Sequence, residues 1–378
     1  RVPRWFTEGL SEWETEQRDR DFQRRTHAEL YGALSTGQLL PIERLNSGFT
    51  RARSLSGIVV AYHEAAEVMG FLVKRLGFPA IVKGLRLFSE GKKTEEVLPA
   101  ITGQTLAALN QQFQADLAEH LSAYRGTFVL RPSEYADPED LERRIKEAPK
   151  DARAHGLLAL ALLKAGDAAK ALTEARAAQQ LDPACLEALM AEAEALYRKK
   201  DLPAAEAKLR ALVAQRDSYD ARERLGEILV ARDAQGWEAE FQAAKKLDPD
   251  RGEPYLELAR RYEKSGRKDE AIKELMAAAH LDVMDAPLWR QVTKKLYEAK
   301  RWREVVEYGA GARLLSPYDP DLRAQLGEAL LQLNRKPEAR IELDAALQAL
   351  PEPSDEEDAA AQKTRRETLK KLRQRAGG

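Results

Sequence analysis

The sequence is poor in cysteine, in aromatic residues and in net charge, and each shortage excludes a class of protein. Cys185 is the sole cysteine among 378 residues, so the chain has no intramolecular disulfide framework. The 61 basic and 62 acidic side chains leave a formal net charge of −1, which removes the bulk attraction on which basic nucleic-acid binders depend. No uninterrupted apolar run approaches the ~18 residues of a membrane span. We therefore expect neither nucleic acid as a partner nor a membrane span.

Motifs of common catalytic sites are also absent. The chain has no Ser-His-Asp or Cys-His pattern, no phosphate-binding loop and no dinucleotide-binding glycine fingerprint. Histidines 27, 120, 155 and 280 are scattered singly and form no recognisable metal-ligand motif. The length predicts two or three domains. The sequence begins at Arg1 without a signal-peptide pattern, which predicts a processed or partial chain.

An internal repeat fills the C-terminal two-thirds of the chain. Separations of 66, 68 and 34 residues join the loop prolines Pro183, Pro249, Pro317 and Pro351. These separations are close to multiples of 33 or 34, and each period predicts a helix, a turn, a second helix and a loop. A short side chain recurs in the second helix, at Ala171, Ala205, Ala271 and Ala339. The repeat therefore predicts a stack of helical hairpins whose paired helices approach closely.

This pattern resembles the tetratricopeptide repeat family. Leu225-Gly226 and Leu326-Gly327 match the family's Leu-Gly pair, and Trp289 matches its early tryptophan. The resemblance implies an α-solenoid of about six repeats, at residues 152–185, 186–218, 219–251, 252–285, 286–319 and 320–353. The third repeat departs from the pattern, because it has lost about one residue near the turn between its helices.

The predicted fold class is all-α, with a helical subdomain followed by the α-solenoid. We expect domains at residues 1–130, a linker helix at 131–151, the solenoid at 152–353 and a C-terminal capping helix at 354–378. Ser354 is the expected N-cap, and acidic residues near the start with basic residues near the end complement the helix dipole. A nucleic-acid or membrane role for the basic end of this helix is the alternative.

In tetratricopeptide proteins the first helix of each hairpin lines a concave face that binds a protein or peptide. The resemblance implies that polar groove residues are Glu194, Glu223, Glu227, Arg260, Arg290, Lys294 and Glu328. The family's clamp for peptide C-termini needs Asn residues that are absent here. Two interpretations of the groove stand. In the first, its basic cluster binds an acidic or extended peptide, since an Arg guanidinium makes two parallel hydrogen bonds to one carboxylate. In the second, its charges form ion pairs with acidic residues of adjoining repeats, and the face is exposed to solvent.

The first 130 residues predict at least four amphipathic helices from apolar residues spaced three and four apart. We expect helices to start at Thr94 and Thr105 and to stop at Gly77 and Gly91. Residues 36–54 are predicted to form a connecting loop. Nothing in the sequence predicts a strand.

Residues 2–14, VPRWFTEGLSEWE, resemble the segment that follows the zinc-binding helix of gluzincin metallopeptidases. The resemblance implies that Glu8 is the third zinc ligand of a full-length enzyme. Residues 61–77 resemble a downstream helix of these enzymes, which implies that Tyr62 stabilises the oxyanion of the reaction intermediate. The alternatives are an ordinary helix carboxylate for Glu8 and a half-buried packing residue for Tyr62.

The HExxH motif that binds zinc in gluzincins is absent from the sequence. The nearest string, residues 63–67, has Glu67 in place of the second histidine, and a site of His63, Glu67 and Glu8 is a weaker alternative. Zinc is therefore expected only in a full-length protein, and this chain alone is expected to be inactive.

Two functions are compatible with these patterns. The first is the C-terminal part of a gluzincin-like zinc metallopeptidase whose repeats recruit a protein partner or substrate. The alternative is a non-catalytic scaffold or adaptor built on a degenerate peptidase fold. The resemblance favours an exported bacterial protein over a cytoplasmic one, and the oligomeric state stays open.

Overall fold

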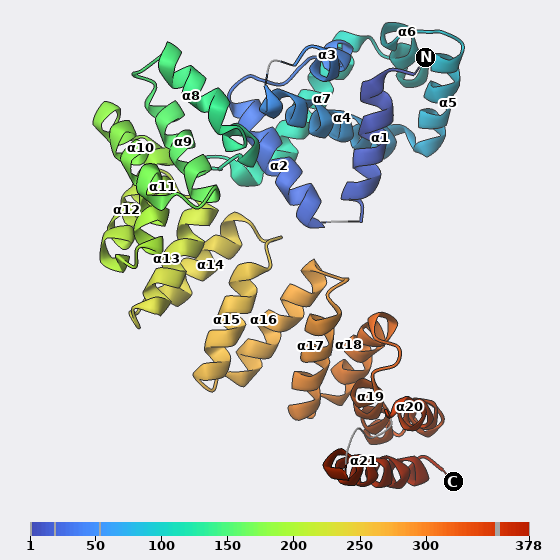
Figure 1. The fold of residues 1–378 in the computed structure, drawn as a ribbon. Helices are drawn as coiled ribbons and strands as arrows, with labels where there is room; N and C mark the ends of the chain where they lie inside the picture. The colour runs from blue at the N-terminus through green and yellow to red at the C-terminus, as the bar shows by residue number, and fades with distance from the viewer. Residues whose placement is uncertain (1, 19, 53, 352–355, 378) are drawn as a thin grey trace. The chain divides into compact units, whose positions relative to one another are not determined.

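The chain folds entirely into helices and connecting loops in the part that the structure covers (Figure 1). The structure is a computed structural model that describes residues 2–18, 20–52, 54–351 and 356–377. No strand occurs in these ranges, which agrees with the predicted all-α fold. Contacts between Cα atoms divide the chain into two units, unit 1 at Arg1–Arg251 and unit 2 at Gly252–Gly378.

The N-terminal helices of unit 1 surround one long central helix. They are α1 (Arg4–Glu16), α2 (Arg20–Ser35), α3 (Leu45–Thr50), α4 (Leu55–Leu76), α5 (Phe78–Ser89), α6 (Thr94–Thr102) and α7 (Leu106–His120). Helix α4 packs against α1 along its length and also contacts α2, α3, α5 and α7. The side chains of Trp5, Phe6, Met69 and Phe88 are fully buried between these helices. This apolar core holds the N-terminal helices together.

Helix α4 is long and apolar enough to cross a bilayer by length and composition. We did not identify it from the sequence, because we considered only uninterrupted runs of apolar residues. Half of its apolar window is buried inside unit 1. The helix also carries buried Glu64 and half-buried His63 and Glu67. A core helix accounts for these features, since it satisfies such groups with polar partners from neighbouring helices.

The predicted helix limits in this region are mostly correct. Gly77 caps the end of α4, Thr105 caps the start of α7, and α6 starts at Thr94. The predicted loop at 36–54 is wrong in part, because it contains a 3-10 helix at Ile42–Arg44 and helix α3. Helix α2, which no sequence pattern indicated, is the second difference.

Six helical hairpins follow the short helix α8 (Pro138–Glu147). Those of unit 1 are α9 (Ala152–Lys164) with α10 (Ala168–Leu181), α11 (Leu186–Arg198) with α12 (Leu202–Gln215), and α13 (Tyr219–Ala231) with α14 (Trp237–Leu247). Those of unit 2 are α15 (Glu253–Lys264) with α16 (Lys268–Leu281), α17 (Ala286–Glu298) with α18 (Trp302–Leu315), and α19 (Pro320–Gln332) with α20 (Lys336–Ala349). Each predicted repeat range thus contains one helical hairpin.

The turn inside every hairpin contains a residue with positive φ. These residues are Gly166, Lys200, Asp233, Gly266, Lys300 and Asn334, which follow one another at intervals of 33 or 34. The third hairpin departs from the others, although not through the shortened turn that its sequence suggested. Its turn, residues 232–236, is longer than the others, and α14 has 11 residues where the second helices of the other hairpins have 14.

Small residues bring the two helices of a hairpin together. The alanines predicted for this purpose are all buried, namely Ala171, Ala205, Ala271 and Ala339. On the facing helix, a Cβ added to Gly226 would lie 2.8 Å from the Phe241 ring. Glycine at this position therefore lets α13 and α14 pack around a fully buried aromatic side chain.

We expect Gly226→Ala to destabilise unit 1 by about 1–2 kcal/mol, because overpacking against Phe241 outweighs the better helix propensity of alanine. Gly252→Ala is the matched control, since a Cβ there meets no atom within 4 Å in the described residues. Chemical denaturation of both variants checks the prediction. A Gly226→Ala protein as stable as the control would mean that the Phe241 ring moves at little cost.

The predicted C-terminal capping helix corresponds to α21 (Glu356–Arg375), which packs against α20. Leu369 and Ala376 bury their side chains against Leu343 and Leu350. Arg373 forms an ion pair of 2.9 Å with Asp344 on α20. The expected N-cap, Ser354, lies outside the described residues.

Candidate functional site

The predicted groove acids of unit 1 lie together on the first helices of its hairpins. Glu194 on α11 forms ion pairs of 3.0 Å with Arg198 on the same helix and with Arg224 on α13. Arg224 also pairs with Glu227, and its guanidinium lies over the Tyr197 ring. The network joins two neighbouring repeats through Arg224, which does not belong to the predicted basic cluster.

The third acid of this set, Glu223, accepts a hydrogen bond of 3.2 Å from the Tyr219 hydroxyl. Its carboxylate also lies 3.9 Å from Arg251. The Arg251 guanidinium covers the face of Tyr219 at 3.7 Å from the ring centroid. Tyr219 and Arg251, the two partners of Glu223, also line the pocket that is described below.

The predicted groove residues of unit 2 are less constrained. Arg260 pairs with Glu257 one turn earlier on α15, and its side chain is 57% exposed. Arg290 on α17 pairs with Asp319 at 3.0 Å, and Glu328 on α19 accepts a hydrogen bond of 2.5 Å from Tyr297. Lys294 is exposed and forms no ion pair with any residue that the structure describes. Unit 2 thus presents cations that are open to solvent.

A segment of the chain that precedes the repeats packs against the first hairpins. Residues 127–131 have no regular secondary structure. The Phe128 amide donates a hydrogen bond of 2.7 Å to the carbonyl of Asp217, just before α13. The Phe128 side chain is only 8% exposed and shares a buried cluster with Leu157 of α9 and Leu189 of α11. We call residues 127–131 the internal strap.

The internal strap is also anchored at its far end. Arg131 is 2% exposed and pairs through Nε with Glu29 of α2 at 3.2 Å. Its guanidinium donates further hydrogen bonds to Gln38, Ser56 and Glu134, at 3.0–3.3 Å. One end of the strap is therefore bound by the repeats and the other by the N-terminal helices.

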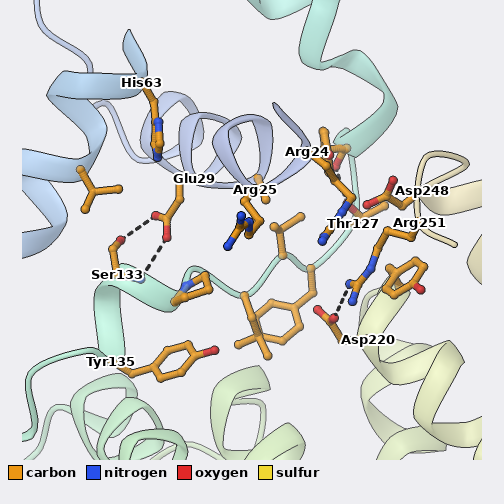
Figure 2. Close-up of a pocket in the computed structure, with 18 of the residues that line it drawn as sticks. Arg24, Arg25, Glu29, His63, Thr127, Ser133, Tyr135, Asp220, Asp248 and Arg251 are labelled. Carbon is orange, nitrogen blue, oxygen red and sulfur yellow. Dashed lines mark hydrogen bonds and ion pairs between the residues drawn. The ribbon is translucent and has the colours of Figure 1, made fainter. Parts of the chain in front are cut away.

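A pocket of about 580 Å³ opens along the strap within unit 1 (Figure 2). Its volume is in the range of small-molecule sites. Apolar lining comes from residues such as Leu55, Val59 and Val129, and charged lining comes from Arg24, Arg25, Glu29, Lys164, Asp220, Asp248 and Arg251. Figure 2 shows the ion pair of Asp220 with Arg251, at 2.9 Å, and the two hydrogen bonds that Ser133 donates to Glu29.

Burial determines the titration of several groups that line this pocket. It raises the pKa of Asp248 to about 6, against the opposing effects of Arg24 and Arg251. It raises the pKa of Tyr135 to about 12, with a further contribution from Asp220, and lowers the pKa of His63 to about 4. His63 is therefore neutral near pH 7. The four cations of the lining exceed its three carboxylates by one, so the pocket has a small excess of positive charge.

The two residues predicted from the gluzincin resemblance lie in one cluster. Arg4 donates a hydrogen bond of 3.1 Å to Glu8 and another of 2.8 Å to the Tyr62 hydroxyl. Its guanidinium also lies over the Phe49 and Tyr62 rings, at 5.7 and 5.9 Å. The structure thus brings Glu8 and Tyr62 to the same arginine, although 54 positions separate them in the sequence.

These residues alone do not complete a zinc site. Glu8 contributes one carboxylate, which an arginine already binds, and no described histidine joins it in a group of metal-ligand geometry. The weaker alternative of His63, Glu67 and Glu8 fails for a physical reason. His63 directs Nδ1 to the Thr26 hydroxyl at 3.2 Å, and the histidines that contact Glu67 are His27 and His120.

Comparison with known families identifies the repeats. A tetratricopeptide repeat model matches residues 139–184 and 157–221. Residues 139–221 thus contain tetratricopeptide repeats. The helix pairs that flank the matched residues have the same hairpin form and the same period. A comparison with curated protein sequences gives no match.

The chain is similar to several solved tetratricopeptide proteins at low sequence identity. The C-terminal part of one from Cytophaga hutchinsonii is 13% identical, with 58% of this chain and 90% of that chain covered and a TM-score of 0.42. One from Parabacteroides merdae is 13% identical, with 70% and 98% covered and a TM-score of 0.37. YrrB, described as having an unusual peptide-binding site, is 17% identical, with 60% and 100% covered and a TM-score of 0.29.

The comparisons support the tetratricopeptide part of our prediction, and they give no support to the gluzincin part. The roles of Glu8 and Tyr62 stay predictions. Sequence reasoning missed two features, the internal strap and the contact of His27 and His120 with Glu67. An aromatic residue at the end of the predicted N-terminal domain, Phe128, was the one available signal for the strap.

Proposed function

We propose that the chain is a non-catalytic scaffold whose repeats bind an extended segment of a protein partner. The observation that carries this proposal is the internal strap. The unit 1 hairpins hold a peptide segment without regular secondary structure through a main-chain hydrogen bond to Asp217, in the loop before α13, and through a buried aromatic side chain, Phe128. Extended peptides in general bind to proteins through these two kinds of contact.

The strap already packs against the hairpins of unit 1, so we assign partner binding to the first helices of unit 2. Arg260 on α15 and Arg290 and Lys294 on α17 are solvent-accessible there. Tyr297 and Leu256 add partly buried apolar surface on the same helices. A partner segment that alternates acidic and apolar side chains matches this chemistry, because cations at accessible positions guide acidic ligands.

A labelled extended peptide of about ten residues, made of Glu and Leu and spanning roughly 35 Å, is a suitable probe. We expect the protein to bind it and the double variant Arg260→Glu, Lys294→Glu to bind it at least about tenfold more weakly, with the loss largest at low salt. Fluorescence anisotropy measures both affinities.

The matched control reverses two charges on second helices of the same unit. Lys273 on α16 and Arg303 on α18 are exposed, and Lys273→Glu, Arg303→Glu has the same net charge as the test variant. We expect it to keep the affinity of the unmodified protein. Equal weakening of both double variants would show attraction by net charge alone, and equal retention would place the partner on another face.

Peptidase activity is the second candidate function, and one observation favours it. Arg4 joins Glu8 and Tyr62, the two residues to which the gluzincin resemblance assigned chemistry. The residues of this chain do not complete a zinc site at Glu8, so we expect no hydrolysis of a casein substrate. Hydrolysis that Glu8→Gln abolishes would overturn the scaffold proposal, and equal hydrolysis by both proteins would remove Glu8 from any mechanism.

A further inference from the structure

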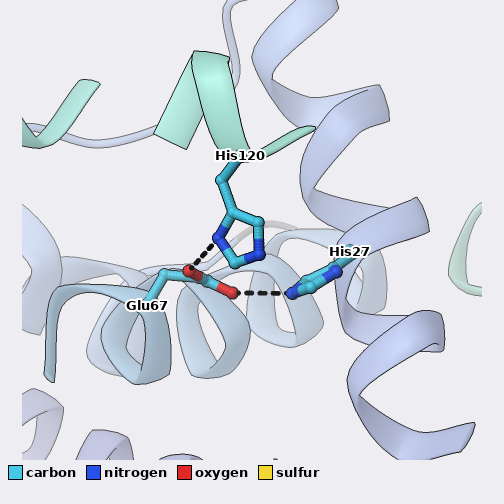
Figure 3. Close-up of side chains that lie close together, drawn as sticks. All are labelled: His27, Glu67 and His120. Atoms are coloured by element: carbon cyan, nitrogen blue, oxygen red, sulfur yellow. Dashed lines mark ion pairs between the residues drawn. The ribbon is translucent and has the colours of Figure 1, made fainter. Parts of the chain in front are cut away.

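Three side chains from three helices converge inside unit 1 at a place that the strap and the groove do not use (Figure 3). His27 lies on α2, Glu67 on α4, and His120 at the end of α7. The Glu67 carboxylate presents one oxygen to each imidazole. Oε1 lies 3.1 Å from His27 Nε2, and Oε2 lies 3.5 Å from His120 Nδ1.

We propose that His27, Glu67 and His120 bind a divalent transition-metal ion of the Zn²⁺ class. Their ligand atoms all lie within 4.8 Å of one another. Tetrahedral Zn²⁺ with bonds of about 2.0–2.1 Å requires ligand atoms roughly 3.3 Å apart, so small side-chain rotations complete the geometry. Two imidazoles and one carboxylate form a ligand set that suits transition metals better than Mg²⁺ or Ca²⁺.

Unsatisfied polar atoms support this assignment independently. His27 Nε2 is buried and makes no hydrogen bond of good geometry to any described residue, despite its short distance to the carboxylate. Glu16 on α1, which interacts electrostatically with Glu67, also has a buried oxygen without a hydrogen-bond partner in the described residues. Buried polar atoms without partners are costly, and a dication next to Glu67 offsets that cost.

The three ligands differ in their access to solvent. The side chains of His27 and Glu67 are 14% and 12% exposed, whereas that of His120 is 45% exposed. The site is therefore anchored inside the helical core and open on the His120 side. Three protein ligands with an open fourth position leave room for a water molecule on the metal, and an ion can enter without unfolding of the helices.

The neighbouring histidine has a different role. His63 lies one turn before Glu67 on α4, but its Nδ1 faces the Thr26 hydroxyl at 3.2 Å. Its ring packs edge-on against Phe22, with 5.9 Å between the ring centroids. His63 thus supports the α2–α4 contact that positions His27 and is not itself assigned as a ligand.

Metal-free protein titrated with Zn²⁺ in a calorimeter tests this assignment. We expect about one ion per chain, a higher thermal midpoint with Zn²⁺ and its reversal by a chelator. His120→Gln is the principal variant, since His120 is the most exposed ligand and its loss endangers folding least. We expect it to bind Zn²⁺ at least about tenfold more weakly, and Co²⁺ in the unmodified protein to give a tetrahedral absorption spectrum that the variant lacks.

His155→Gln serves as the matched control. His155 pairs with Glu174 at 2.7 Å on the first hairpin, so the substitution removes a His–Glu contact of a similar kind outside the proposed site. We expect it to keep Zn²⁺ affinity. The proposal is overturned by a protein that binds no Zn²⁺, by equal losses in both variants, or by equal stabilisation with Mg²⁺. The peptide-binding proposal for unit 2 is unaffected, whether these results support the metal site or overturn it.

Discussion

Replacing Arg131 with methionine is expected to lower the free energy of unfolding of unit 1 by about 3–5 kcal/mol. Arg131 is 2% exposed and Glu29 is 4% exposed, so both charges of this pair are removed from water. Without the guanidinium, the Glu29 carboxylate keeps only the two hydrogen bonds from Ser133, at 2.9 and 2.6 Å. Gln38 and Ser56 lose a partner at the same time.

The arginine side chain also packs closely against the backbone of α2. A Cβ added to Gly32 on α2 would lie 2.1 Å from Arg131 Cδ, so the side chain passes directly over a glycine. Methionine fills this path but donates no hydrogen bond. Arg131→Lys keeps the charge and loses the planar fork that contacts several acceptors, so we expect an intermediate loss of stability.

Chemical denaturation with Arg153→Met as the control checks this prediction. Arg153 pairs with the same Glu134, but its side chain is 44% exposed, so its removal is expected to cost about 1 kcal/mol or less. The double variant Arg131→Met, Glu29→Gln is expected to be more stable than the sum of the single effects predicts, because it removes both buried charges. Additive single effects would mean that the two side chains do not interact energetically.

The period of the repeats predicted the architecture of the C-terminal part well. Loop prolines, the small alanines and the Leu-Gly pairs recur because each hairpin solves the same packing problem, and the six hairpins occur in the expected ranges. Local signals also located Gly77 and Thr105 at helix ends. These features depend on neighbours in the sequence, and a periodic pattern records them directly.

Contacts between distant residues left no such record. His27, Glu67 and His120 are 40 and 53 positions apart, and only the packing of α2 and α7 on α4 brings them together. Helix α2 itself was missed, because its charged residues obscure its apolar stripe. The internal strap depends on a main-chain hydrogen bond and on a groove whose shape is set by several repeats. Side-chain type alone could not predict its place.

The strap connects the N-terminal helices to the repeats through contacts at both of its ends. Phe128 anchors it in the repeats, and Arg131 anchors it to α2. A partner for the groove of unit 1 would have to displace both anchors, including a buried ion pair. Unit 2 has solvent-accessible cations on its first helices instead, and partner binding there requires no such displacement.

The second large effect concerns Glu64, a buried carboxyl group on α4. It is 1% exposed, and both of its oxygens lie 3.0 Å from the Leu40 amide. Burial raises the pKa of this carboxyl group to about 8, and the hydrogen bond from Leu40 opposes the shift. The folded protein therefore favours the protonated form. The resulting stabilisation is fully present below the ordinary pKa of 4.5 and is lost as the pH rises through about 8.

Glu64→Gln isolates this contribution, since glutamine has nearly the shape of the protonated side chain and does not ionise. We expect both proteins to be similarly stable at low pH and the variant to be more stable above pH 8, by roughly 2–4 kcal/mol. Urea denaturation across this pH range measures the difference, and Glu142→Gln at an exposed position on α8 is the control. Parallel stability curves for Glu64→Gln and the unmodified protein would show that Glu64 ionises in the folded state at little cost. A rising difference would identify the buried α4 carboxyl group as a main cause of alkaline destabilisation in unit 1.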